Sequence, residues 1–118
     1  MEVVKNTKIK VSASSFETKY DEEHGKYYEV RFNVINKSKK SITVQAREIS
    51  GDGKMVPDEM TYLSQDISAG KTADVVLEIR DYDNKNVPVI ENDLELLLNV
   101  STSDFEEYIE YPVTITLN

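Results

Sequence analysis

Cysteine and tryptophan are absent from this sequence of 118 residues, and histidine occurs once. Without cysteine there is no disulfide framework, no thiolate zinc site and no cysteine nucleophile. One histidine cannot supply a histidine-based zinc site. That residue, His24, lies in the charged turn Asp21-Glu22-Glu23-His24-Gly25, and no serine has the flanking glycines of a nucleophile elbow. We therefore expect no catalytic residues and a protein that is not an enzyme.

Long apolar runs are also missing. No stretch approaches the roughly 20 apolar residues that cross a bilayer, so we expect no transmembrane segment. The opening residues, Met1-Glu2-Val3-Val4-Lys5, contain no apolar segment of signal-peptide length.

Basic residues are fewer than acidic ones, 14 against 22, which gives a formal net charge of -8. Such a field repels the phosphates of nucleic acids and anionic membrane surfaces, so neither is an expected partner. The one basic cluster, Lys37, Lys39 and Lys40, is interpreted as a solvated turn. Gly70-Lys71-Thr72 is interpreted as a glycine turn, because a phosphate-binding loop needs a glycine five positions earlier, where the chain has Gln65.

Alternation of apolar and polar residues is the dominant pattern that is present. Successive side chains of a strand point to opposite faces, so a period of two predicts strands with one buried face. The predicted inward sets are Ile9, Val11 and Ala13; Tyr28, Val30, Phe32 and Val34; Ile42, Val44 and Ala46; Ala73, Val75, Leu77 and Ile79; Leu94, Leu96, Leu98 and Val100; and Ile109, Tyr111, Val113, Ile115 and Leu117.

Turn residues separate these segments and add weaker ones. Asp52-Gly53 favours a hairpin that returns as a short strand at Met55-Val56, and a further weak strand is predicted from Tyr62 to Ile67. Pro112 lacks an amide hydrogen, which predicts an edge or bulged position in the last strand. Residues 1–118 are thus expected to form a single all-β domain, an immunoglobulin-like antiparallel β-sandwich of about seven to eight strands.

The longest irregular stretch runs from Asp81 to Asp93, with at most one helical turn expected. It contains the candidate binding residues Asp81, Tyr82, Asp83, Asn84 and Asn86. Loops at the end of a sandwich are free to vary without damage to the core, so any binding surface is predicted here. A long solvent loop without a role is the plain alternative. Calcium is another, because the loop offers several oxygens, although Lys85 occupies an alternating ligand position and no glutamate follows at the usual spacing.

Three segments of the chain resemble a known family. They are Val34-Ile35-Asn36-Lys37-Ser38-Lys39-Lys40-Ser41-Ile42-Thr43-Val44-Gln45-Ala46, followed by a glycine turn and Met55-Val56, and then Ser68-Ala69-Gly70-Lys71. This order resembles the telokin-like, immunoglobulin-fold domains of secreted or lipid-anchored proteins of Gram-positive bacteria, which are mostly of unknown function. The resemblance implies an extracellular or cell-surface location and no catalytic residues. The leading hypothesis is a non-catalytic domain that binds a protein or another ligand at the cell envelope. The second is a calcium-stabilised adhesion or accessory module.

Overall fold

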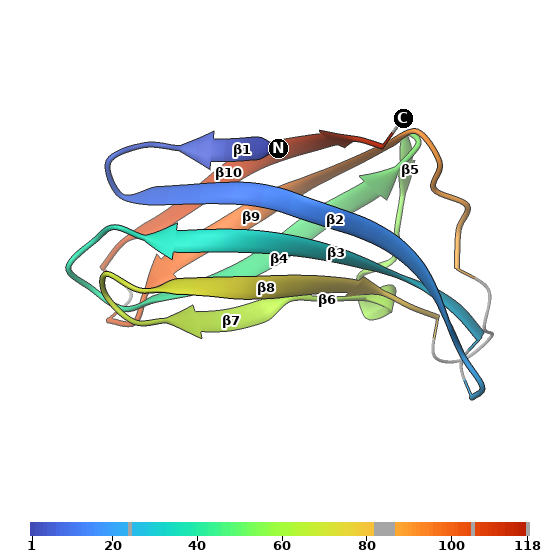
Figure 1. The fold of residues 1–118 in the computed structure, drawn as a ribbon, viewed down its shortest axis with the longest axis horizontal. Coiled ribbons are helices and arrows are strands. Elements are labelled where there is room, and N and C mark those ends of the chain that lie inside the picture. Colours follow the sequence, from blue (N-terminus) through green and yellow to red (C-terminus); the bar gives the residue numbers. More distant parts are fainter. Residues whose placement is uncertain (24, 82–86, 105, 118) are drawn as a thin grey trace.

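Alternating apolar residues build two antiparallel sheets that pack face to face (Figure 1). The computed structural model describes residues 1–23, 25–81, 87–104 and 106–117, and these contain ten strands. The first sheet has the order β1 (Glu2–Lys5), β2 (Ile9–Asp21), β3 (Gly25–Asn36), β8 (Thr72–Ile79) and β6 (Thr61–Tyr62). The second has β10 (Tyr108–Thr116), β9 (Asp93–Thr102) and β4 (Ile42–Gly51), and both β7 (Ser64–Ile67) and β5 (Lys54–Met55) pair with the outer edge of β4.

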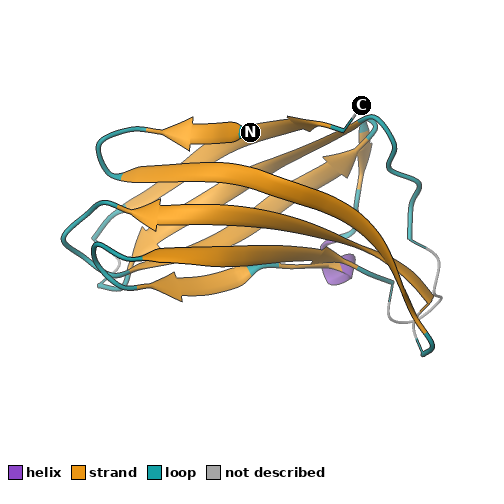
Figure 2. Ribbon diagram, viewed as in Figure 1, coloured by secondary structure: helices purple, strands orange, loops and turns teal. Residues whose placement is uncertain are grey.

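The predicted all-β sandwich is therefore confirmed, with more strands than expected. The helical content of the described residues is one 3₁₀ turn, Asp58–Met60, drawn in purple in Figure 2. None of the described residues belongs to a helix that is long and apolar enough to cross a membrane.

The inward registers of the predicted strands form the core. Val30 and Val34 of β3, Val44 of β4 and Leu77 of β8 are 0% exposed. Their polar neighbours alternate toward solvent, as Arg31 does on β3. Because the apolar faces of both sheets meet between the layers, hydrophobic burial fixes the register of each strand.

Two elements differ from the expected strand pattern. The chain from Tyr62 to Ile67 is two strands, because β6 pairs with β8 in the first sheet and β7 pairs with β4 in the second. Leu63, which is buried, lies at the point of crossing between them. β1 was not predicted, because Val4 is its one fully buried residue and the segment shows no alternation.

The predicted Asp52-Gly53 hairpin and the predicted edge position of Pro112 are confirmed, and the returning strand is Lys54–Met55 in place of Met55-Val56. Asp52 and Gly53 have φ angles of +51° and +82°, the positive pair of a two-residue hairpin that suits the twist of the flanking strands. The hairpin joins β4 to β5. Pro112 lies in β10, which is the edge strand of its sheet.

Asn36 connects two turns at one end of the sandwich. Its side chain is 0% exposed, and its amide nitrogen donates to the backbone oxygens of Lys40 (2.8 Å), Ile67 (3.1 Å) and Ser68 (3.2 Å). Its carbonyl oxygen accepts hydrogen bonds from the backbone nitrogen (3.0 Å) and hydroxyl (2.7 Å) of Ser38. One buried amide thus joins the β3–β4 turn to the β7–β8 turn.

Candidate interaction surface

The predicted binding loop follows β8. Tyr82, Asp83, Asn84 and Asn86 lie outside the described residues, so the structure leaves their role in binding or in calcium coordination as a prediction. Asp81 is described and is only 5% exposed. Asp81 therefore lies beside the end of a core strand and not in open solvent.

The second half of this loop is held against the sandwich. The hydroxyl of Tyr28 donates to the backbone oxygen of Pro88 (3.0 Å) and accepts from the backbone nitrogen of Ile90 (3.3 Å). Asp52 accepts hydrogen bonds from the next three backbone nitrogens, those of Glu91 (2.9 Å), Asn92 (2.8 Å) and Asp93 (3.0 Å). These donors stabilise the carboxylate and lower the pKa of Asp52 below its usual value. Sequence alone did not reveal this anchor, because its two parts lie about 40 residues apart. No helical turn forms in the described part of the loop, Asp81 and residues 87–92.

Arg80 fixes the start of the loop. It is 9% exposed, and its guanidinium contacts the carboxylates of Asp21 (2.8 Å) and Glu78 (3.2 Å). Its Cζ atom lies 3.7 Å from the centre of the Tyr27 ring. Arg80 therefore ties β8 to the long β2–β3 hairpin, which curves past the end of the sandwich (Figure 1).

At the opposite end, acidic side chains neutralise the lysine-rich turn. The Lys40 ammonium pairs with Asp104 (3.1 Å) and Glu106 (2.5 Å) of the β9–β10 connection. The pKa of Asp104 falls to about 2, chiefly because the Thr102 hydroxyl donates to it, with further support from the backbone nitrogen of Glu106 and from Lys40. With Lys40 already paired, this turn is consistent with the predicted solvated connection.

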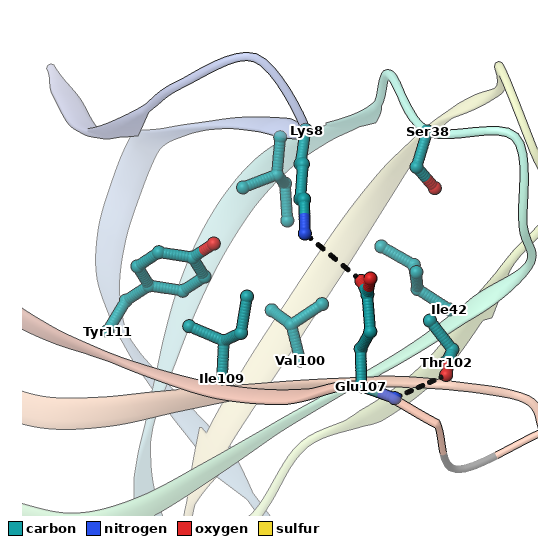
Figure 3. Close-up of a pocket in the computed structure, with 9 residues that line it drawn as sticks. Lys8, Ser38, Ile42, Val100, Thr102, Glu107, Ile109 and Tyr111 are labelled. Atoms are coloured by element: carbon teal, nitrogen blue, oxygen red, sulfur yellow. Dashed lines mark hydrogen bonds and ion pairs between the residues drawn. The ribbon is translucent and has the colours of Figure 1, made fainter.

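A small cavity opens beside this end of the molecule (Figure 3). Lys8 and Glu107 form an ion pair of 3.2 Å across it, and the backbone nitrogen of Glu107 donates to the Thr102 hydroxyl (3.1 Å). Its volume is about 30 Å³. That is enough for a water molecule, whereas a small organic ligand needs about 300 Å³ or more.

Two larger hollows lie where the chain crosses between the sheets. One groove, of about 540 Å³, is lined by residues 45–48 of β4, Asp58 and residues 61–64. The other, of about 350 Å³, is lined by Tyr62, Ser64, Gln65, residues 74–76 and Glu78. Tyr62 and Ser64 line both grooves. We call the surface formed by the two grooves the crossover surface.

A β-bulge shapes the first groove. β4 and β9 pair up to Arg47 opposite Leu97 and resume at Ser50 opposite Glu95, so β4 contains one extra residue. Glu48 in this bulge has a φ of +49°, a left-handed conformation that costs a non-glycine residue roughly 1–2 kcal/mol. Bulges of this kind redirect side chains and are frequent beside functional sites.

The crossover surface carries an exposed aromatic ring and an excess of negative charge. Tyr62 is 64% exposed and stands between the two grooves. The lining contains four carboxylates, those of Glu48, Asp58, Asp74 and Glu78, and one cation, Arg47. Sequence analysis did not identify this surface, although the polar run Ser64-Gln65-Asp66 interrupts the alternation there.

Metal-ligating side chains do not gather in the parts of the chain that the structure describes. In residues 1–23, 25–81, 87–104 and 106–117, no three histidine, aspartate or glutamate side chains come together as a group that could hold a metal ion. His24 lies outside these ranges.

Solved structures, but no family model and no curated protein, show similarity to this chain. The X-ray structure of Northeast Structural Genomics Consortium target SoR45 is similar, with a TM-score of 0.54 and 12% identity over 93% of this chain and 86% of that one. The FixG-related protein from Vibrio parahaemolyticus has a TM-score of 0.42 and 10% identity over 90% and 94%. DesR, a β-glucosidase from Streptomyces venezuelae, has a TM-score of 0.43 and 16% identity over 93% of this chain and 15% of DesR. The first of these similarities supports the β-rich fold alone.

Proposed function

We propose that this chain is a non-catalytic binding domain of the immunoglobulin-like, telokin-like type, which contacts a partner protein at the outside of the bacterial cell envelope. The crossover surface carries the proposal, because it combines two grooves, an exposed tyrosine and incompletely paired strand edges. Tyrosine contributes a large contact area at a small cost in conformational entropy, and it is enriched among the residues that dominate binding energy.

The proposed location at the cell envelope rests on the resemblance of the segments around Asn36 and Ser68 to telokin-like domains. These segments are the turns that the buried Asn36 amide joins, so the resemblance involves a structural unit rather than isolated residues. A sandwich held together by its core and by such hydrogen bonds does not depend on disulfides.

A peptide-display library panned against the folded chain tests the proposal. Selected peptides are titrated against the wild type, Tyr62→Ala, and the matched control Tyr108→Ala, whose tyrosine is also exposed (53%) but begins β10. We expect binding to weaken by about tenfold or more in Tyr62→Ala and to stay unchanged in Tyr108→Ala. Both variants should melt like the wild type. A panning experiment that yields no binders, or binders indifferent to Tyr62, would overturn the proposal.

A further inference from the structure

One edge of β8 is open for most of its length. β8 pairs with β3 from Thr72 to Ile79, whereas on its other side β6 pairs only with Ile79 and Glu78. The backbone nitrogen of Arg80 donates to the Met60 oxygen (2.7 Å) on the β6 side. Because the backbone groups of an antiparallel strand alternate between its two edges, the even-numbered residues of β8 direct their N–H and C=O groups away from β3.

Thr72, Asp74 and Val76 therefore present their backbone groups at this edge, and on this side of β8 no described strand pairs with these three residues. After Tyr62 the chain pairs with β4 as β7, so the β6–β8 ladder ends at Glu78. The groove of about 350 Å³ follows this open edge, with Gln65 on its far wall. An unpaired edge beside a groove is the arrangement that accepts an added peptide strand.

The charges of the edge select the occupant. Asp74, Val76 and Glu78 share the outward face of β8, and four residues along a strand place Asp74 and Glu78 about 13 Å apart. Tyr62 of β6 already lies opposite Glu78, whose carboxylate pairs with Arg80, so an added strand would face Thr72, Asp74 and Val76. A cationic residue directly opposite Asp74, at about 5 Å, would face its carboxylate, and a β-branched residue two positions away would pack on Val76.

A second copy of this chain fits the edge poorly. Two-fold antiparallel pairing of the open residues Thr72 to Val76 with those of a second copy, centred on Asp74, would set the two Asp74 carboxylates directly opposite one another, and like charges directly opposite destabilise a strand pair. Each copy also carries a net charge of -8. The acidic edge therefore disfavours self-association and favours a basic segment.

We propose that the open edge of β8 binds an extended basic segment of a partner protein as an added antiparallel strand. This inference rests on the proposed function and names the class of partner. Antiparallel addition continues the direction in which β6 already pairs with β8.

The probe is a synthetic peptide of about seven residues, alternating threonine and valine, with one lysine at its centre to face Asp74. A matched peptide carries a glutamate in place of the lysine. Affinity is measured by calorimetry at low salt, and amide hydrogen exchange is measured by NMR. The lysine peptide should bind and slow exchange at the amides of Thr72, Asp74 and Val76, and the glutamate peptide should not bind.

Two variants locate the contact. Val76→Pro removes an N–H that the open edge alone presents, so it should fold and bind the peptide about tenfold or more weakly. Asp74→Lys should weaken binding similarly by charge, and it keeps the inference testable if the proline variant fails to fold. Glu110→Lys, at an exposed position on β10, is the control and should bind like the wild type.

The outcomes separate this inference from the proposed function. Library peptides that depend on Tyr62, together with a lysine peptide that binds wild type and both β8 variants equally, would overturn strand addition and leave the binding function intact. Absence of any binder at the crossover surface would overturn both. Slowed exchange at the β8 amides on self-association, without peptide, would overturn the basic partner in favour of a second copy.

Discussion

A methyl group added at Gly51 would test whether the loop after β8 packs on the sandwich as described. Gly51 is buried at the end of β4, and a Cβ atom there would lie 2.5 Å from Cγ1 and 2.8 Å from Cδ1 of Ile90. Carbon atoms normally approach to about 3.5–4.0 Å, so Ile90 would have to move by about 1 Å. Ile90 is only 4% exposed and has little room to do so.

The size of the effect follows from two opposing contributions. Overpacking costs about 1–3 kcal/mol, and replacing glycine by alanine at an unstrained position restores about 0.4–1 kcal/mol by restricting the unfolded chain. Gly51→Ala should therefore lower the free energy of unfolding by about 1–2 kcal/mol, or the melting temperature by about 4–8 °C. Ile90→Ala alone should cost about 2–5 kcal/mol through the cavity that it leaves.

The double variant, Gly51→Ala with Ile90→Ala, tests whether residue 51 and Ile90 are in direct contact. Without the branches of Ile90 the added methyl group meets no clash and fills part of the cavity, so Gly51→Ala should become neutral or stabilising in the Ile90→Ala background. Urea denaturation of all four proteins should give a coupling energy of about 1–3 kcal/mol. Val89→Ala, which truncates an exposed neighbour, is the control and should show no coupling with Gly51→Ala. Additive effects of Gly51→Ala and Ile90→Ala would refute the described packing of this loop.

Three further predictions concern register, turns and pH. Val30→Asp should unfold the protein and Arg31→Asp should be nearly silent, because a buried unpaired carboxylate costs several kcal/mol against a total of about 5–15 kcal/mol; equal melting temperatures would contradict the strand register. Asn36→Ala should lower the free energy of unfolding by about 2–4 kcal/mol by leaving buried carbonyl oxygens without donors, and an unchanged urea midpoint would argue against the amide connection. The lowered pKa values of Asp52 and Asp104 (the latter about 2) contribute stability above their usual value of 3.8, which is lost as pH falls through the folded-state values. Melting curves should therefore shift downward on acidification below about pH 4, less steeply in Asp52→Asn, and equal shifts would count against the three-amide anchor.

Strand positions were predictable because each predicted strand buries alternate residues on one face. The run from Tyr28 to Val34 shows this most clearly, since its inward residues are all at most 2% exposed. A pattern of this kind depends on the sheet having one dry face and not on the identity of the neighbouring strand. Because the pattern carries no information about the neighbouring strand, the order in which the strands pair was not predictable.

The crossing between sheets was not predictable from local sequence. β6 has two residues and β7 has four, too few for a period to show. Gln65 occupies the core-side register opposite Val44 yet is exposed, because the groove beside β8 separates it from the opposite sheet. In the sequence alone, a polar residue at such a position indicates a loop and not a strand.

The edges of the two sheets are protected in different ways, and the difference concerns binding. β10 has Pro112, which contributes no N–H, and β1 is a strand of four residues. Between Thr72 and Leu77, β8 contains no proline and is not a short strand. The negative charge of its outward face limits the strands that can pair with it. A proline or a short strand excludes every added strand, whereas charge excludes acidic strands and admits basic ones. The protection of β8 is therefore selective, and a selective edge is what a binding domain needs if it is to pair with a partner and stay apart from its own copies.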